Sequence, residues 1–381
     1  MTAATASEVE ALRDRFRDAA AAGAPLRIVG GGTWLDAGRP VPNSDAVSMR
    51  AFDGITEYVP GDLTLTARGG TTLAEIRDAT AAHGQWLALD PHGSDEGTIG
   101  ATVATASAGP LVTTFGAPRD LMLGLEFVTA TGAIVRGGGR VVKNVAGFDL
   151  TRLVTGSWGT LGAITEVSVR LHARPAVDES VSVSLDDGNA GVERVRTLLR
   201  RLPFTPYACE VVNAHLSRAL GLGDAPAVIV RLGGNADAVR AQRGALNDVG
   251  TPRPADPMVW ARLRTCEPAG AITIRLSALP SRLEGTWREA ARLTTSCLDA
   301  MIHATPTRGV VRCIVPRSTS AIDALERALS TDGGVKRVGE RLPPALWRAF
   351  APPANDRVSR GIKATFDPAD VLNRGILGAS A

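Results

Sequence analysis

The sequence predicts an α+β protein with two regions of different character. Residues 24 to about 175 are rich in Gly, Thr and Val and alternate short strands with short helices. From Val177 to about Arg341, strands alternate with longer helices rich in Ala, Arg and Leu, which is typical of a second α+β domain. The length of 381 residues exceeds that of one ordinary hydrophobic core and also favours two domains.

The N-terminal segment predicts an amphipathic helix. Ser7 and Glu10 have the spacing of a capping box, and Gly23 ends the pattern. The apolar face consists of Val9, Leu12 and Phe16. Charges run through the segment, which excludes a secretory signal peptide, and the sequence has no run of the ~20 apolar residues that a membrane span needs. We therefore expect a cytoplasmic protein that reaches the inner membrane only through partners.

Period-2 patterns and turn residues predict the strands of the first region. "PLRIV" is a buried strand that leads into Gly30–Gly32, and "DLTLTAR" alternates like a half-exposed strand. Thr72 and Glu75 predict the cap of a helix that ends near Gly84. "LGLEFVTATGAIV" predicts two strands joined by a turn at Thr131–Gly132, and "GAITEVSVRL" predicts the last strand.

The second region has clear strands in "AVIVRL", "AITIRLSA" and "GVVRCIVP". Its clear helices are "ADAVRAQRGALNDV", "LEGTWREAARLTTSCLDA" and "AIDALERALS", and "TPRPADP" predicts a surface loop. "LPPALWRAFAPPAN" indicates a second junction, after which the composition resembles the first region again. The predicted division is residues 1–175, residues 176–342, and a segment 343–381 that returns to the first domain.

Composition excludes several classes of function. The net charge is +3 with both signs interspersed, and aromatics are sparse, which argues against nucleic-acid binding. The thiols Cys209, Cys266, Cys297 and Cys313 form no C-x-x-C pair, so we expect neither an iron–sulfur cluster nor structural zinc. The five histidines are isolated from one another in sequence, so we expect surface or packing roles and no metal site.

Three glycine-rich segments could approach a large ligand. In "IVGGGTWLDAG", a strand ends in consecutive glycines whose N–H groups could form an anion-binding nest, although a simple turn is the alternative. In "DPHGSDEGTIGATVATASAGP", Thr98 could cap a helix whose N-terminus faces a pyrophosphate. Close packing of backbone on backbone is the alternative for this second segment.

The third segment is "GGGRVVKNVAGFDLTRLVTGSWGTLG", residues 137–162. It contains Lys143, Asn144 and Asp149 among glycines. An ammonium or N–H donor there would stabilise a reduced flavin, on which negative charge gathers. The alternative is that Lys143 pairs with Asp149 as a structural bridge.

The order of these segments resembles the FAD-binding fold shared by vanillyl-alcohol-oxidase-type and p-cresol-methylhydroxylase-type (PCMH-type) flavoproteins. The stretch from "GGRVVKNVAGFDL" to "VSVRLHARP" is most similar to the family of E subunits of bacterial glycolate oxidase (glycolate dehydrogenase). "GTIGATVATASAGP" and the tail "IKATFDPADVLNRGIL" are also similar to that family. The resemblance implies a two-subdomain FAD-binding PCMH-type domain with a smaller α+β cap domain, and it is weak across the cap.

The resemblance also implies cofactor-binding residues. Those that would hold FAD, together with the polar residues of the third segment, are Gly30, Gly31, Gly32, Thr33, Gly97, Thr98, Gly100, Ala101, Ala106, Gly109, Pro110, Lys143, Asn144, Asp149, Gly162 and Ile164. Ile164 would lie near the adenine. His92 lies in "PHGSDEG", which is not a tethering motif, so we expect a surface histidine there and noncovalent FAD.

The implied function is oxidation of glycolate or D-lactate to the 2-oxo acid within a complex. The implied partners are a larger FAD-binding catalytic subunit and an iron–sulfur subunit. The His-x-His motif of that larger subunit is absent here, so catalysis by this chain stays open and no catalytic residue is assigned. The strand arginines Arg231, Arg275 and Arg312 could bind a substrate carboxylate. The alternatives are a non-catalytic subunit with a structural or relay FAD, and a free-standing oxidase of another small alcohol.

Overall fold

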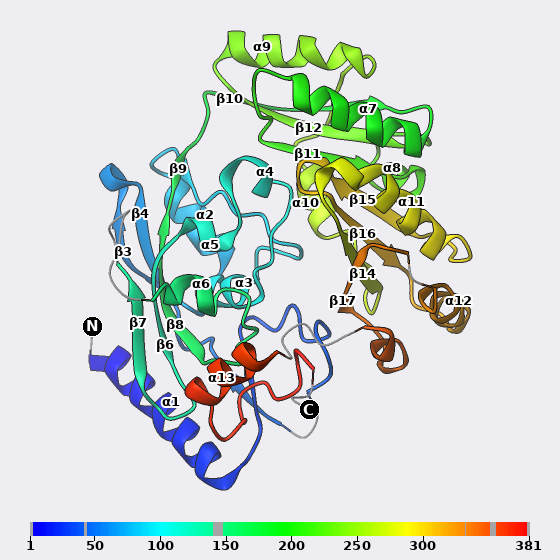
Figure 1. The fold of residues 1–381 in the computed structure, drawn as a ribbon. Helices are drawn as coiled ribbons and strands as arrows, with labels where there is room; N and C mark the ends of the chain where they lie inside the picture. Colours follow the sequence, from blue (N-terminus) through cyan, green and yellow to red (C-terminus); the bar gives the residue numbers. More distant parts are fainter. Residues whose placement is uncertain (1–2, 42–43, 140–147, 332, 351–355, 379–381) are drawn as a thin grey trace.

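The computed structural model describes residues 3–41, 44–139, 148–331, 333–350 and 356–378. Its ribbon has two lobes, and the C-terminal helix returns to the lobe that holds the N-terminus (Figure 1). Within these ranges, no helix combines the length and the apolar character that a membrane span requires. Both lobes mix antiparallel sheet with helices, so the α+β prediction is confirmed.

The first lobe is built on a sheet in the order β3-β4-β8-β6-β7, with antiparallel neighbours. Its strands are β3 (Ile55–Val59), β4 (Thr64–Arg68), β8 (Ala163–Arg170), β6 (Met122–Val128) and β7 (Ile134–Gly138). The helices around it are α2 (Leu73–Ala81), α3 (Ile99–Thr105), α4 (Val112–Phe115), α5 (Pro118–Leu121) and α6 (Leu150–Val154). The β6–β7 hairpin and the capping box of Thr72 and Glu75 on α2 confirm the sequence predictions.

Helix α1 (Ala3–Ala22) packs its predicted apolar face into a cluster beneath this sheet. Val9, Leu12 and Phe16 are all buried there. The predicted capping box at Ser7 is wrong, because the helix begins four residues earlier. Instead of reaching back to the backbone of Ser7, Glu10 pairs with Arg13 at 2.6 Å.

The chain ends meet at a parallel pair, β1 (Leu26–Val29) and β2 (Asp45–Ser48). After α13 (Arg357–Phe366), the tail runs beside β1, where Leu26 forms a parallel bridge with Leu372. The N–H of Leu26 donates to the carbonyl of Val371 at 2.7 Å. The tail therefore completes the part of the first lobe that carries the glycine loop.

The second lobe is built on a sheet in the order β13-β10-β12-β11-β15-β16-β14-β17, with antiparallel neighbours. Its strands are β13 (Arg253–Pro254), β10 (Val177–Ser184), β12 (Ala227–Gly234), β11 (Ala208–Val212), β15 (Met301–Thr305), β16 (Val310–Val315), β14 (Ile272–Ser277) and β17 (Lys336–Arg341). β13 lies in "TPRPADP", so that segment is not wholly a loop as predicted but adds a short edge strand.

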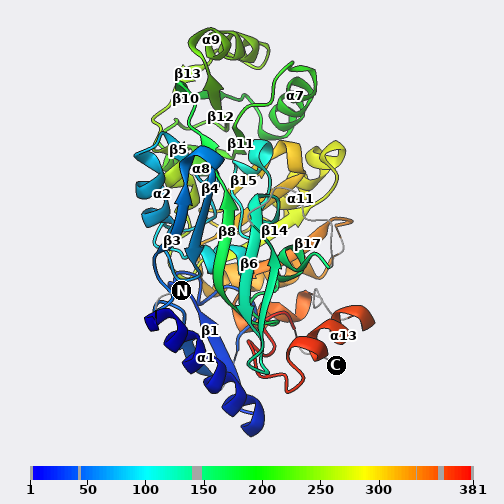
Figure 2. The ribbon, with the colours of Figure 1, turned by 90° about the vertical axis from the view of Figure 1, so that its left-hand side faces the viewer.

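The two faces of this sheet are covered differently. One face packs on α7 (Gly188–Arg201), α9 (Ala236–Ala245), α11 (Leu283–Thr294) and α12 (Thr319–Leu329). The other packs on α8 (Ala214–Ala219), α10 (Val259–Arg264) and the first-lobe residues Trp86 and Leu111. The two lobes are seen from a second side in Figure 2. Strands β11, β15 and β16 therefore have buried residues on both faces.

Candidate active site and cofactor cleft

A groove lies where the glycine loop after β1 faces the start of α3. A Cβ atom on Gly30 would lie 2.5 Å from Oγ1 of Thr98, and one on Gly31 would lie 2.7 Å from the carbonyl oxygen of Glu96. The two segments therefore approach so closely that a side chain on the loop would collide with its neighbour. Thr98 caps α3 by accepting a hydrogen bond from the N–H of Ala101 at 3.3 Å, as predicted.

We call this hollow the loop groove. The predicted cofactor residues that line it are Gly30, Gly31, Gly32, Thr33, Thr98, Gly100, Ala101, Gly162 and Ile164. They come from the glycine loop, from α3 and from the start of β8. Gly97 lies just before α3, where its carbonyl accepts a hydrogen bond from the N–H of Leu73 at 3.0 Å, and it is not among the lining residues.

The residues of the loop groove that sequence reasoning missed include Trp34, Trp158, Asn373 and Ile376. Asn373 fastens the tail to the groove, because its Oδ1 accepts from the N–H of Ile28 at 2.7 Å and its Nδ2 donates to the carbonyl of Trp158 at 2.6 Å. The signal for Asn373 was present, since it is the asparagine of the tail motif. The two tryptophans stand in quoted segments but had no assigned role.

A larger cleft of about 900 Å³ adjoins the loop groove, and we call it the sheet cleft. Trp34, Thr105, Trp158 and Ile376 line both hollows, so the two meet there. The predicted residues Ala106, Gly109 and Pro110 line the sheet cleft on the side of the first lobe. The loop groove and the sheet cleft thus form one continuous path.

The opposite wall of the sheet cleft is a row of polar side chains across four strands of the second sheet. Glu210 comes from β11, His303 from β15, Arg312 from β16 and Arg275 from β14. Sheet register places His303 directly opposite Arg312, and Arg312 directly opposite Arg275. Directly opposed residues of antiparallel strands project on the same face, so these side chains are neighbours.

Glu210 and His303 form a buried hydrogen-bonded pair. Glu210 has no exposed surface and His303 is only 3% exposed. Nδ1 of His303 lies 2.7 Å from Oε2 of Glu210, and the hydroxyl of Thr305 donates to the other carboxylate oxygen. A carboxylate accepts from both neighbours, so we assign the imidazole proton to Nδ1. Nε2 of His303 is then an acceptor.

Arg312 is the buried centre of an ion-pair network. It is 3% exposed, and its Nη2 lies 2.6 Å from Glu340 and 2.8 Å from Glu267. Arg275 adds a hydrogen bond to Glu340 at 2.9 Å, and Arg341 contacts Glu267 at 2.5 Å. Burial alone would lower the pKa of Arg312, but the two carboxylates outweigh burial and raise it above its ordinary value.

Six residues that line the sheet cleft have a buried polar atom without a hydrogen-bond partner among the described residues. These atoms are Nδ1 of His92, Oγ of Ser107, Nε2 of His303, Nη1 of Arg312, Nε of Arg337 and Nε1 of Trp347. Buried polar groups are nearly always hydrogen-bonded to protein, water or ligand, because an unpaired one costs about 1–3 kcal/mol. These atoms therefore indicate a cleft that takes up polar molecules.

The expectation for His92 was wrong. His92 was expected on the surface, but it lines the sheet cleft, and its ring centroid lies 5.7 Å from that of His303. The histidines are isolated in sequence but not in space, because a loop and a strand bring these two together. Burial, followed by the charge of Arg312, lowers the pKa of His92 well below 6.5, so this ring is neutral.

Other sequence-predicted residues lie away from the two hollows or outside the described residues. Lys143 and Asn144 fall outside the residues that the structure describes. The side chain of Asp149 caps α6 and pairs with Arg152 at 3.1 Å, and it lines neither hollow. Arg231 pairs with Asp178 at 2.6 Å outside the sheet cleft, whereas Arg275 and Arg312 line it.

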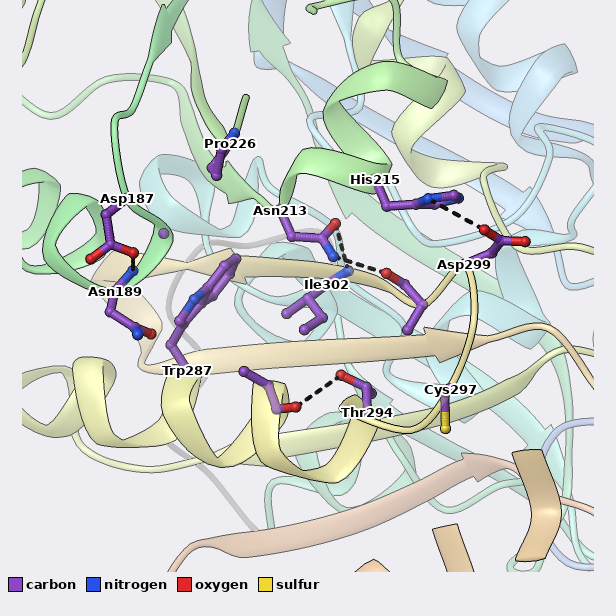
Figure 3. Close-up of a pocket in the computed structure, with 13 residues that line it drawn as sticks. Asp187, Asn189, Asn213, His215, Pro226, Trp287, Thr294, Cys297, Asp299 and Ile302 are labelled. Carbon is purple, nitrogen blue, oxygen red and sulfur yellow. Dashed lines mark hydrogen bonds and ion pairs between the residues drawn. The ribbon is translucent and has the colours of Figure 1, made fainter. Parts of the chain in front are cut away.

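A separate hollow of about 420 Å³ lies on the helix-covered side of the second sheet (Figure 3). Its lining includes Trp287 from α11, Ile302 from β15 and Asn213, which caps α8. Ile302 precedes His303 and faces the opposite side of the sheet, since successive strand residues alternate. The polar side chains here are already engaged: His215 lies 3.7 Å from Asp299, and Asn213 hydrogen-bonds the main chain. Among the described residues, buried polar atoms without a hydrogen-bond partner therefore occur at the sheet cleft and not at this hollow.

Residues 2–138 match the family described as an FAD binding domain. The chain is 38% identical over 197 residues to glycolate oxidase subunit GlcE of Escherichia coli, a match that covers 51% of this chain and 56% of that protein. It is 34% identical over 209 residues to D-lactate dehydrogenase of Archaeoglobus fulgidus, covering 52% and 44%. The matched region therefore spans about half the length of these relatives.

The chain is also similar to a probable mitochondrial D-lactate dehydrogenase of Danio rerio. This match is longer, with 25% identity over 92% of this chain and 79% of that protein. Among solved structures, p-cresol methylhydroxylase with substrate bound superposes with a TM-score of 0.75 at 16% identity, covering 97% of this chain and 87% of that one. The chain thus has the PCMH-type fold, as predicted, and its cofactor is FAD.

The residues of the two hollows fit an extended dinucleotide. The loop groove offers main chain and small side chains, which a pyrophosphate can approach closely. The first N–H groups of α3 are already used, since Ile99 donates to Thr71, Gly100 to Gly69 and Ala101 to Thr98. At the junction with the sheet cleft, Trp34 and Trp158 have ring centroids 6.4 Å apart. The sheet cleft on the other side of this junction has polar lining residues, among them Glu210, His303 and Arg312.

Among the described residues, no group of three or more His, Cys, Asp or Glu side chains could hold a metal ion. Cys209, Cys297 and Cys313 are buried free thiols, and Cys266 is half-buried. Burial raises the pKa of Cys266 to about 12 and that of Cys313 to about 12, so these thiols are unreactive near neutral pH.

Proposed function

We propose that this chain is an FAD-binding subunit of a 2-hydroxy-acid dehydrogenase complex that oxidises glycolate or D-lactate to the 2-oxo acid. The observation that carries the proposal is the continuous path from the loop groove into the sheet cleft, where the wall changes from bare main chain to buried polar side chains. FAD, when bound, supplies the acceptor for the hydride of the carbinol carbon. The loop groove residues would hold its dinucleotide part without a covalent bond.

The charge of the sheet cleft favours a small anionic substrate. Its basic lining residues are Arg39, Arg119, Arg152, Arg275, Arg308, Arg312, Lys336 and Arg337, and its acidic ones are Glu210 and Glu340. A concave site lined mostly by one sign of charge focuses its field and concentrates ligands of the opposite sign. A 2-hydroxy acid carries the carboxylate that such a site attracts.

The names of the relatives support the same substrate class and a complex. Subunits of glycolate oxidase and D-lactate dehydrogenases are among the proteins similar to this chain. Electrons would pass to an iron–sulfur partner, since the thiols of this chain are too far apart in sequence for a cluster. We also propose the division into residues 1–175, 176–342 and 343–381 for the FAD domain, the cap and the returning segment.

A second candidate function is a relay subunit, in which FAD carries electrons but the alcohol is oxidised on a larger flavoprotein partner. The observation that favours it is the lack of a His-x-His motif in the sequence and of a metal-binding group among the described residues. The two candidates differ in whether the sheet cleft of this chain binds and oxidises the acid.

The cofactor path can be tested at Thr105, which lines both hollows. Thr105→Met puts a longer side chain at the junction, and we expect at least about tenfold weaker FAD retention after gel filtration. The matched control is Thr365→Met, because Thr365 is an exposed helical threonine that makes the same hydrogen bond to the carbonyl four residues earlier. Equal FAD content in both variants would contradict the cofactor path.

The substrate is tested on the purified, FAD-loaded chain under anaerobic conditions. We expect glycolate or D-lactate to bleach the flavin absorbance near neutral pH, and acetate or propionate to leave it unchanged because they lack the hydroxyl. Bleaching only after addition of a larger flavoprotein partner would favour the relay function instead.

A further inference from the structure

We infer that Glu210, His303 and Arg312 form a substrate site on this chain, in which Arg312 binds the carboxylate of a small 2-hydroxy acid and His303 accepts the proton of its hydroxyl. The inference rests on the proposed function and deepens it, because it assigns the chemistry to the cap sheet of this chain and not to a partner. Arg312 and His303 are then catalytic residues, and Glu210 is a positioning residue.

The position of the unpaired atoms supports this assignment. Nη1 of Arg312 and Nε2 of His303 are both buried and both lack a partner among the described residues. The two residues are direct cross-strand neighbours of β15 and β16, so one small ligand can reach both. A guanidinium N–H is a donor and an unprotonated imidazole nitrogen is an acceptor, which matches a carboxylate beside an O–H group.

The ion-pair network holds Arg312 in place. Its Nη2 contacts both Glu267 and Glu340, and these carboxylates are also shared by Arg341 and by the partly exposed Arg275. Because these contacts use Nη2, Nη1 of Arg312 stays available as a donor to a carboxylate.

The Glu210–His303 pair has the geometry of an oriented base. The carboxylate of Glu210 holds the proton of His303 on Nδ1, and the unpaired Nε2 belongs to a ring that lines the sheet cleft. When the substrate O–H bond breaks, its proton goes to Nε2, and Glu210 stabilises the resulting imidazolium. The carbinol C–H bond breaks as the C=O bond forms, and its hydrogen leaves with the electron pair as a hydride for which the flavin is the acceptor.

The carboxylate site is tested by calorimetric titration of oxalate into the FAD-loaded chain, a measurement that needs no turnover. Arg312→Lys keeps the positive charge between Glu267 and Glu340 but loses the guanidinium fork, and we expect the Kd for oxalate to rise at least about tenfold. The control is Arg231→Lys, which changes a strand arginine of the same sheet outside the cleft and should leave the Kd within about twofold. Equal affinity for oxalate in both variants would overturn the carboxylate assignment.

The proton acceptor is tested by the rate of anaerobic flavin reduction with D-lactate. We expect His303→Gln to slow reduction at least about 100-fold while the Kd for oxalate changes less than about threefold. His215→Gln, in the separate hollow, should reduce at the wild-type rate. Because His303→Gln leaves the buried carboxylate of Glu210 with Thr305 as its remaining partner, the double variant Glu210→Gln/His303→Gln removes the carboxylate together with the imidazole and serves if the single variant does not fold.

Glu210→Gln separates positioning from packing. A carboxylate that stabilises the imidazolium affects the pH dependence, so we expect the acid limb of the reduction-rate profile to move in Glu210→Gln, whereas a packing role would lower the rate equally at every pH. If the wild-type chain neither binds oxalate nor is bleached by any 2-hydroxy acid, the proposed function fails. If it does both, but the His303 and Arg312 variants behave as wild type, only this inference fails.

Discussion

The two lobes build their halves of the site by opposite means. On the first lobe, the loop groove is made of main chain and small residues, drawn from compact stretches such as Gly30–Thr33 and Thr98–Ala101. On the second, the wall of the sheet cleft is made of long polar and charged side chains from five neighbouring strands, β11, β15, β16, β14 and β17. A cofactor common to many enzymes can be held by main chain, whereas one particular substrate requires side chains in a particular arrangement.

The comparison extends to electrostatics, because each lobe contributes a buried carboxyl group with the opposite pKa shift. Burial raises the pKa of Asp90 to about 7, despite its hydrogen bonds from the N–H of Leu111 and the nearby charge of Arg264. Burial would also raise the pKa of Glu340, but the charges of Arg312 and Arg275 outweigh it and lower that pKa. In the first lobe, the neighbours of Asp90 do not offset the effect of burial on its pKa. In the second, the arginines next to Glu340 do.

The largest effect that we predict comes from Asp90. Its folded-state pKa lies above the unfolded value of about 3.9, so its contribution to stability is complete below that pH and is lost as pH rises toward 7. The loss amounts to roughly 4 kcal/mol by linkage. Asp90→Asn cannot ionise, so we expect the unfolding free energy of the variant, measured with urea from pH 4 to 8, to lack this decline.

Glu340 supplies the contrasting case for that experiment. Its lowered pKa gives stability that is present above the unfolded value and is lost as pH falls through the folded one. We therefore expect Glu340→Gln to lose less stability than wild type on acidification below about pH 4.5. If all three proteins gave parallel curves, the electrostatic contrast between the lobes would be wrong.

The next prediction concerns the close main-chain packing of the first lobe. A Cβ on Gly100, in α3, would lie 2.6 Å from the carbonyl oxygen of Gly69, and backbone cannot move aside cheaply. We expect Gly100→Ala to lower the unfolding free energy by about 1–3 kcal/mol and to release FAD. Gly285→Ala is the control on the second lobe: the position is helical with no atom within 4 Å, so the substitution should raise stability by about 0.5–1 kcal/mol.

The smallest predicted effect concerns the connection between the lobes. Arg341 of β17 lies over the ring of Trp34, 5.2 Å from its centroid, and its Nε is 3.1 Å from Asp36 in the glycine-loop segment. We expect Asp36→Asn, which removes only the exposed pair between the lobes and keeps the buried pair of Arg341 with Glu267, to cost at most about 1 kcal/mol and to speed FAD dissociation severalfold, as followed by flavin fluorescence. Arg348→Gln removes an exposed pair with Glu326 and should change neither quantity.

The sequence by itself determined most of the elements and half of the site. Period-2 strands and the cap of α2 appear where the patterns predicted, because these signals are local. The glycine loop was also predictable, since a main chain that must approach its neighbour closely requires glycine. Thr98 was predictable because threonine is a common helix-capping residue. The prediction failed where two local signals differ. At Ser7, the sequence offers a good capping residue, but the helix already begins at Ala3.

Only the tertiary structure decided the wall of the sheet cleft. Glu210, His303 and Arg312 stand on strands distant in sequence, and only the strand order β11-β15-β16 makes them neighbours. His92 reaches the same place from a loop of the other lobe. No spacing in the sequence encodes such contacts, because long-range sheet register is set by the burial of both faces of the whole sheet and not by any one residue in it.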